Sequence, residues 1–180
     1  MKKFEEIKFN IGSLKGISAK NVEEHLKLYA GYVKNINLIL ETENGKIGFE
    51  FDGMRNHEYY FRALEGGSKN LEENSGLKKQ IEKDFSNFEV WLTKFKNLAT
   101  TRGIGWAMLY YDSETKQLLD AWVDEHHIGQ LNGCKTVIAL DLWEHAFVAD
   151  YQPSGKKQYI EDFFVNLNWE VIEENFKKAL

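Results

Sequence analysis

The chain has 180 residues, of which 43% are hydrophobic and 14% aromatic, and its formal net charge is −5. This length allows one domain or two small ones, and the negative charge argues against a nucleic-acid partner. A single cysteine, Cys134, excludes an intrachain disulfide and is typical of a reducing compartment. No apolar run approaches the roughly 18 residues of a membrane span, and the first residues lack a signal-peptide pattern. The sequence therefore predicts a cytoplasmic protein without a membrane partner.

Helical periodicity dominates the first half of the chain. Apolar side chains that recur every three or four residues predict a first helix over about 18–41, with Ser18 as its N-cap. A second helix is expected over about 54–64, before the Gly-Gly pair at 66–67. A third, single helix is expected over about 77–98.

The pattern of apolar residues changes from helix-like to strand-like after Gly103. Strand-like patterns cover 104–112, 117–125 and 135–140, and two further helices are expected over 159–167 and 170–178. The sequence thus predicts a helical first half followed by a half that mixes helices and strands.

The five histidines are candidates for a metal site, although each alone is more simply a core or turn residue. Asp141 ends an apolar run, where a carboxylate needs a partner. His145 lies four residues later, so a helical continuation of the strand would point both side chains the same way. Two more histidines, from the aromatic-rich helices, could complete a site of three nitrogens and one oxygen. Such a donor set suits Fe, Mn, Cu or Zn, and the lack of thiolates argues against structural zinc.

Residues 141–151, DLWEHAFVADY, resemble the signature D-x-W-E-H-A-x-x-x-D-Y of the iron/manganese superoxide dismutase family. Four more segments are similar to that family in the same order: SAKNVEEHLKLYAGYVKNIN (18–37), MRNHEYYFRAL (54–64), TRGIGWAMLYYD (101–112) and NLNW (166–169). The resemblance covers nearly the whole chain. It implies an α+β fold, with an N-terminal helical hairpin domain over 1–98 and a C-terminal α/β domain over 99–180 that holds a three-stranded antiparallel sheet.

The resemblance also implies a site and a reaction. The family dismutates superoxide to dioxygen and hydrogen peroxide at one Fe or Mn ion per subunit, which alternates between two oxidation states. Trp106 and Trp143 are expected to line the site. The implied ligands are His25, His57, Asp141 and His145, with a solvent molecule as the fifth.

A further residue in this family tunes the metal through a hydrogen bond, commonly a Gln from the second helix or from a turn after the second strand. Position 53, where the helix would supply it, is Gly. His126 lies fifteen residues before Asp141, close to the family spacing for the turn residue, and resembles the branch that uses His. Gln130 and His127 are the alternatives.

The chain departs from the family pattern near the expected substrate channel. Tyr32 resembles the family's gateway tyrosine, but it lies seven residues after His25 instead of the usual eight. Seven residues return to nearly the same face of a regular helix, so we predict no π-bulge in the first helix. Leu28 and Tyr29 replace a family His pair, and Val148 replaces a tyrosine, which implies an altered channel.

The resemblance implies a homodimer, with a tetramer as the alternative. In the family, the residue matching Glu144 hydrogen-bonds the ligand histidine of the partner subunit. Lys156 and Lys157 are candidates for steering superoxide, or ordinary solvated lysines. The sequence does not choose Fe over Mn. Two other functions stay open, a metal-binding or inactive family member with a structural role and another non-haem iron oxidoreductase.

Overall fold

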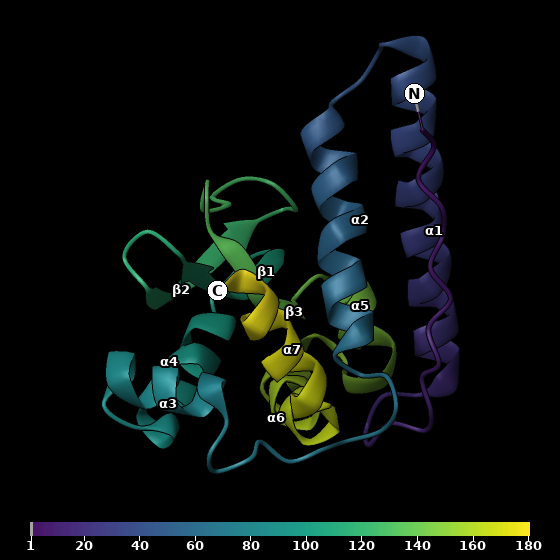
Figure 1. The fold of residues 1–180 in the computed structure, drawn as a ribbon. Helices are drawn as coiled ribbons and strands as arrows, with labels where there is room; N and C mark the ends of the chain where they lie inside the picture. Colours follow the sequence, from purple (N-terminus) through teal and green to yellow (C-terminus); the bar gives the residue numbers. More distant parts are fainter. Residues whose placement is uncertain (1) are drawn as a thin grey trace.

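The computed structural model describes residues 2–180. Its first two helices, α1 (Ala19–Thr42) and α2 (Ile47–Arg62), stand side by side as a long hairpin, with the N-terminal segment running along α1 (Figure 1). The Ser18 hydroxyl accepts a hydrogen bond from the Asn21 amide at 3.1 Å, which confirms the expected N-cap. Helix α1 is α-helical throughout, so the prediction of a helix without a π-bulge is confirmed.

Helix α2 begins seven residues before the expected start at Met54. The segment from Ile47 contains two glycines, which disfavour a helix locally. Tertiary packing overrides this preference, because the Phe51 ring contacts the Phe4 ring of the N-terminal segment, with their centroids 5.8 Å apart. The expected start was therefore wrong.

The single helix expected over 77–98 is two helices, α3 (Gly76–Phe85) and α4 (Phe88–Ala99). Ser86 adopts a positive φ of 78°, which no α-helix tolerates. The Asn87 side chain then caps α4 by accepting a hydrogen bond from the Val90 amide at 2.8 Å. The break is thus a helix end followed directly by a new N-cap.

The sheet is antiparallel and has three strands in the order β2-β1-β3, as expected. The strands are β1 (Gly105–Asp112), β2 (Gln117–Asp124) and β3 (Lys135–Asp141). Strand β1 is central and almost wholly buried. Its register places Trp106 opposite Asp141 at the end of β3.

Four helical segments follow the third strand: α5 (Glu144–Tyr151), the short 3₁₀ helix η1 (Pro153–Gly155), α6 (Lys156–Asn166) and α7 (Trp169–Ala179). The last two confirm the helices expected near the C-terminus, with earlier starts. Asp141 and His145 were expected on one helical continuation of the strand, and this expectation was wrong. Strand β3 runs to Asp141, and α5 begins only at Glu144.

Elements from the two halves of the chain pack against each other around the end of β3. Strand β3 contacts both α2 and α7, and α5 contacts α1. Helices α3 and α4 pack against β2 (Figure 1). Within residues 2–180, no helix is both long and apolar enough to cross a bilayer. The division into domains at residue 98 stays a prediction.

A half-buried carboxyl in β2 predicts a pH-dependent stability. Asp120 accepts a hydrogen bond from the Trp91 indole at 3.0 Å, and burial raises its pKa to about 6. Because the folded-state pKa is raised, ionisation destabilises the fold as the pH climbs above the unfolded value. An Asn at this position keeps the acceptor for Trp91 without the charge.

We therefore expect Asp120→Asn to raise the free energy of unfolding at about pH 7.5 by on the order of 1–2 kcal/mol. The gain should shrink as the pH falls toward about 5, where the wild-type carboxyl is increasingly protonated. Urea unfolding at both pH values measures it. An equal gain at both would contradict the assignment.

Candidate metal centre

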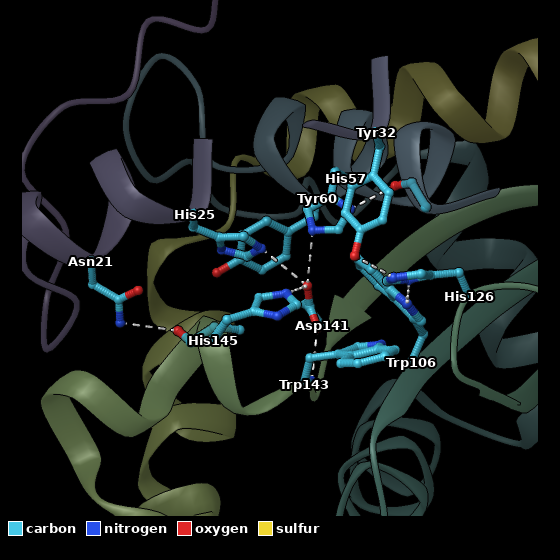
Figure 2. Close-up of polar contacts among 12 residues, drawn as sticks. Asn21, His25, Tyr32, His57, Tyr60, Trp106, His126, Asp141, Trp143 and His145 are labelled. Carbon is cyan, nitrogen blue, oxygen red and sulfur yellow. Dashed lines mark hydrogen bonds and ion pairs between the residues drawn. The ribbon is translucent and has the colours of Figure 1, made fainter. Parts of the chain in front are cut away.

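Four side chains from four elements meet beside the end of β3 (Figure 2). Two come from the helical hairpin, one from the sheet and one from α5. Their potential ligand atoms all lie within 4.8 Å of one another. The four are His25 on α1, His57 on α2, Asp141 on β3 and His145 on α5.

Three imidazole nitrogens face one carboxylate oxygen. The Nε2 atoms of His25, His145 and His57 lie 3.1, 3.2 and 3.5 Å from Asp141 Oδ2. The other oxygen of Asp141 accepts a hydrogen bond from the Trp143 amide at 2.8 Å, which leaves Oδ2 directed at the three rings.

The protonation of these groups leaves the carboxylate short of positive charge. Burial lowers the pKa of His25 and of His57, so both rings are neutral at neutral pH. Burial disfavours the ionised form of Asp141, but the imidazoles of His145 and His25 outweigh it and hold its pKa below the usual range. The neutral rings of His25 and His57 bring no positive charge, and a buried anion needs a counter-charge.

The contacts of His57 support a cation at this point. Its Nδ1–H donates to the Gly53 carbonyl at 2.6 Å, so the neutral ring carries a lone pair on Nε2. That nitrogen is buried and has no hydrogen-bond partner among the described residues. It faces Asp141 Oδ2 with one lone pair toward another, an arrangement that a bound cation relieves. Three imidazole nitrogens and one carboxylate oxygen form a donor set suited to Fe or Mn.

His126 lies next to this cluster and is fully buried. Its Nε2 and the Tyr32 hydroxyl are 2.7 Å apart, and the Trp106 indole N–H donates to its Nδ1 at 3.0 Å (Figure 2). Burial lowers its pKa to about 4. The Trp143 ring stacks on the His126 ring, with a centroid separation of 4.7 Å. Three residues that the family resemblance singled out, Tyr32, Trp106 and Trp143, therefore all contact His126.

The two alternatives to His126 lie elsewhere. The His127 side chain is 29% exposed, and its Nδ1 is 3.9 Å from a Glu125 carboxylate oxygen. Gln130 lies behind His126, where its amide donates to the His126 carbonyl at 2.9 Å and accepts from the Tyr110 hydroxyl.

Asn56 is a site residue that sequence reasoning missed. Its side-chain amide donates to the His126 carbonyl at 3.0 Å, beside the bond from Gln130. Its place directly before His57 in the sequence was visible, but nothing there indicated which backbone group it would bind.

Comparisons with known proteins agree with this geometry. The family model described as iron/manganese superoxide dismutases, C-terminal domain, matches residues 73–175. A superoxide dismutase (Fe) of Aquifex aeolicus is 32% identical over 93% of this chain and 88% of its own length. The chain belongs to the iron/manganese superoxide dismutase family. A superoxide dismutase (Mn) of Haloferax volcanii is 31% identical over 84% of this chain and 82% of its own length, so relatives named for either metal are similar to it.

The geometry explains why position 53 in this member of the superoxide dismutase family is Gly. A Cβ there would lie 2.8 Å from Tyr32 Cδ1 and 3.2 Å from His126 Cδ2. The space that a side chain from α2 would need is therefore filled by the Tyr32 ring and His126.

The remaining candidates from the sequence, Glu144, Lys156 and Lys157, lie partly or wholly at the surface. Glu144 is exposed on α5 and, within residues 2–180, forms no ion pair. Lys156 donates to the Thr101 carbonyl at 2.7 Å and lies over the Trp122 ring, so it is not an ordinary solvated lysine. Lys157 is exposed.

Two glycines of α2 provide a matched test of the packing around Tyr32. Gly48→Ala adds a Cβ that meets only His127, at an ordinary 3.6 Å from Cδ2 and 4.0 Å from Cβ, so we expect stability to stay level or rise by up to about 1 kcal/mol. Gly53→Ala forces the Tyr32 ring to move, so we expect a loss of about 1–3 kcal/mol. Urea unfolding of both variants measures the contrast. Equal stability of the two would show that the Tyr32 ring is free to move aside.

Proposed function

We propose that this protein is a superoxide dismutase that converts superoxide to dioxygen and hydrogen peroxide with one Fe or Mn ion per subunit. The observation that carries the proposal is the buried, unpaired Nε2 of His57 facing Asp141 Oδ2, beside two further imidazoles. Membership of the family supplies the reaction class. A bound Fe or Mn ion would supply the one-electron redox chemistry for oxidising one superoxide and reducing the next.

The proposed ligands are His25, His57, Asp141 and His145. Hydrogen bonds with the backbone fix the orientation of two of these ligands, His57 and Asp141. The Gly53 carbonyl holds His57 with Nε2 toward the centre, and the Trp143 amide holds Asp141 with Oδ2 toward it. A single carboxylate balances only part of the charge of a di- or trivalent ion, so the centre stays positive toward an anionic substrate.

The aromatic surroundings keep the centre dry and small. Trp106 is fully buried, and Trp143 stacks between His126 and His145, with ring centroids 4.7 and 5.6 Å apart respectively. Reduction of superoxide to peroxide also consumes protons. Tyr32 and His126 form a hydrogen-bonded pair beside the centre, and we assign them the task of holding a proton at the Tyr32 hydroxyl.

Two other functions are less consistent with the site. A metal-free structural role gives no reason for burying an unpaired His57 nitrogen beside a carboxylate. A non-haem iron oxygenase that uses two histidines and one carboxylate would not need the third imidazole, His145, at 3.2 Å from Asp141.

A metal and activity assay tests the proposal. Protein loaded with Fe or with Mn should bind about one ion per chain, and at least one form should dismutate superoxide. His57→Ala should lower metal affinity and activity by more than about 100-fold, since loss of an outer partner alone costs 10–100-fold. His127→Ala, outside the cluster, should change neither. Inactivity of both fully loaded forms would overturn the proposal.

We propose in addition that the protein is a homodimer joined across the start of α5. Glu144 supports this, because its carboxylate is exposed next to the ligand candidate His145 and has no ion-pair partner within residues 2–180. In a dimer with twofold symmetry, each Glu144 would reach the His145 of the other subunit.

Sedimentation across a range of protein concentrations tests the dimer. Wild-type protein should sediment as a dimer, and Glu144→Ala should weaken the association by about tenfold or more, since each dimer loses two charge-assisted hydrogen bonds. Glu174→Ala, which removes another exposed acid, on α7, is the control and should leave the dimer unchanged. A monomeric wild-type protein would contradict the proposal.

A further inference from the structure

Three polar side chains lie along one buried stripe of α1. Asn21, His25 and Tyr29 follow one another at intervals of four residues, so they share one face of the helix. Their exposed fractions are 3%, 2% and 0%. Apolar side chains would pack α1 against its neighbours without the cost of burying polar groups, which only hydrogen bonds offset. The partners of these side chains therefore indicate what the stripe does.

Asn21 is bonded to α5 beside the ligand candidate His145. Its side-chain amide donates to the Ala146 carbonyl at 3.2 Å (Figure 2) and to the Asp150 carboxylate at 3.0 Å. Both partners only accept hydrogen bonds, so the NH₂ group of the amide, and not its oxygen, faces them. Ala146 directly follows His145 in the chain. Asn21 thus fixes α1 against the backbone next to His145.

Tyr29 makes a corresponding bond to α2. Its hydroxyl donates to Glu58 Oε1 at 3.2 Å, and the other oxygen of this carboxylate accepts from Arg55 at 2.6 Å. Glu58 is buried and directly follows the ligand candidate His57. Tyr29 thus fixes α1 against the residue next to His57.

The stripe therefore joins α1 to each of the three other elements of the site. Between the two outer bonds, His25 Nε2 lies 3.1 Å from Asp141 Oδ2 on β3. A hydrogen bond weakens steeply when its length or angle changes, whereas apolar surfaces of about the right size tolerate repacking. The two outer bonds thus set the position of α1 along its axis more strictly than apolar contacts would.

We infer that Asn21 and Tyr29 are positioning residues that hold the imidazoles of His25, His57 and His145 together before a metal ion binds. The inference rests on the proposed function for the identity of the ligands. A site that is already arranged spends less free energy on ordering its ligands, so it binds the ion more tightly. The two side chains act through their neighbours, without contacting the ion.

Two variants test the inference by metal binding. Tyr29→Phe removes only the hydroxyl, and Asn21→Leu replaces the amide by an apolar group of similar size. Each should weaken Mn(II) binding by about tenfold or more, at a temperature where circular dichroism shows a fully folded chain. Each should also change the zero-field splitting of bound Mn(II) in the EPR spectrum, which a loss of stability alone would not move. A variant that keeps either the wild-type affinity or the wild-type spectrum would overturn the role of its residue.

Matched variants separate the buried bond from a general loosening of the hairpin. Asn35→Ala removes an exposed hydrogen bond to Glu50 that also joins α1 and α2, and it should change neither the affinity nor the spectrum. Glu58→Gln keeps an acceptor for Tyr29 and should retain the wild-type spectrum, whereas Glu58→Leu should behave like Tyr29→Phe. An Asn35→Ala variant as impaired as Tyr29→Phe would overturn the inference.

Crystal structures of the wild-type protein with and without Mn(II) test the inference without any variant. Both bonds should be present in both structures, and the three imidazoles should shift by less than about 1 Å. Histidines that swing apart in the metal-free crystal while both bonds persist would overturn it. A wild-type protein that binds no metal would refute the proposed function, whereas a metal-binding protein with unaffected variants would refute this inference alone.

Discussion

The charge of one buried carboxylate organises this protein. Asp141 sits at the buried end of β3, where an ionised group has lost its water. Burying it is costly unless a cation and hydrogen bonds replace that water. The Trp143 amide satisfies one oxygen, and three imidazoles crowd around the other. The surrounding elements can be understood as the means of bringing these partners to a single point.

The architecture achieves this by joining two different kinds of structure. The α1–α2 hairpin supplies two imidazoles at fixed separation, and contact between α2 and β3 places them over the end of the strand. The register of β1 with β3 sets Trp106 opposite Asp141, and the same side chain reaches His126. The placement of Asp141 and the hydrogen bond to His126 thus both depend on one strand pairing.

The sequence predicted what repeats along the chain and missed what depends on single residues or on tertiary contacts. Apolar periodicity identified α1 and the three strands, and the family signature identified the four ligand candidates that the fold brings together. The break between α3 and α4 was missed because it rests on the positive φ of Ser86. The early start of α2 was missed because packing of Phe51 outweighs two glycines. The hydrogen bond from Asn56 to the His126 carbonyl depends on strand and turn geometry that no local pattern encodes.

The uninterrupted α1 also limits how the gene can change. Between His25 and Tyr32 lie two turns of helix, and both side chains must face the same side to meet Asp141 and His126 respectively. Losing or gaining one codon here would rotate Tyr32 by about 100° unless a bulge absorbed it. This interval should therefore tolerate substitutions far better than changes of length, and lineages that differ by one residue in it must also differ in helix geometry.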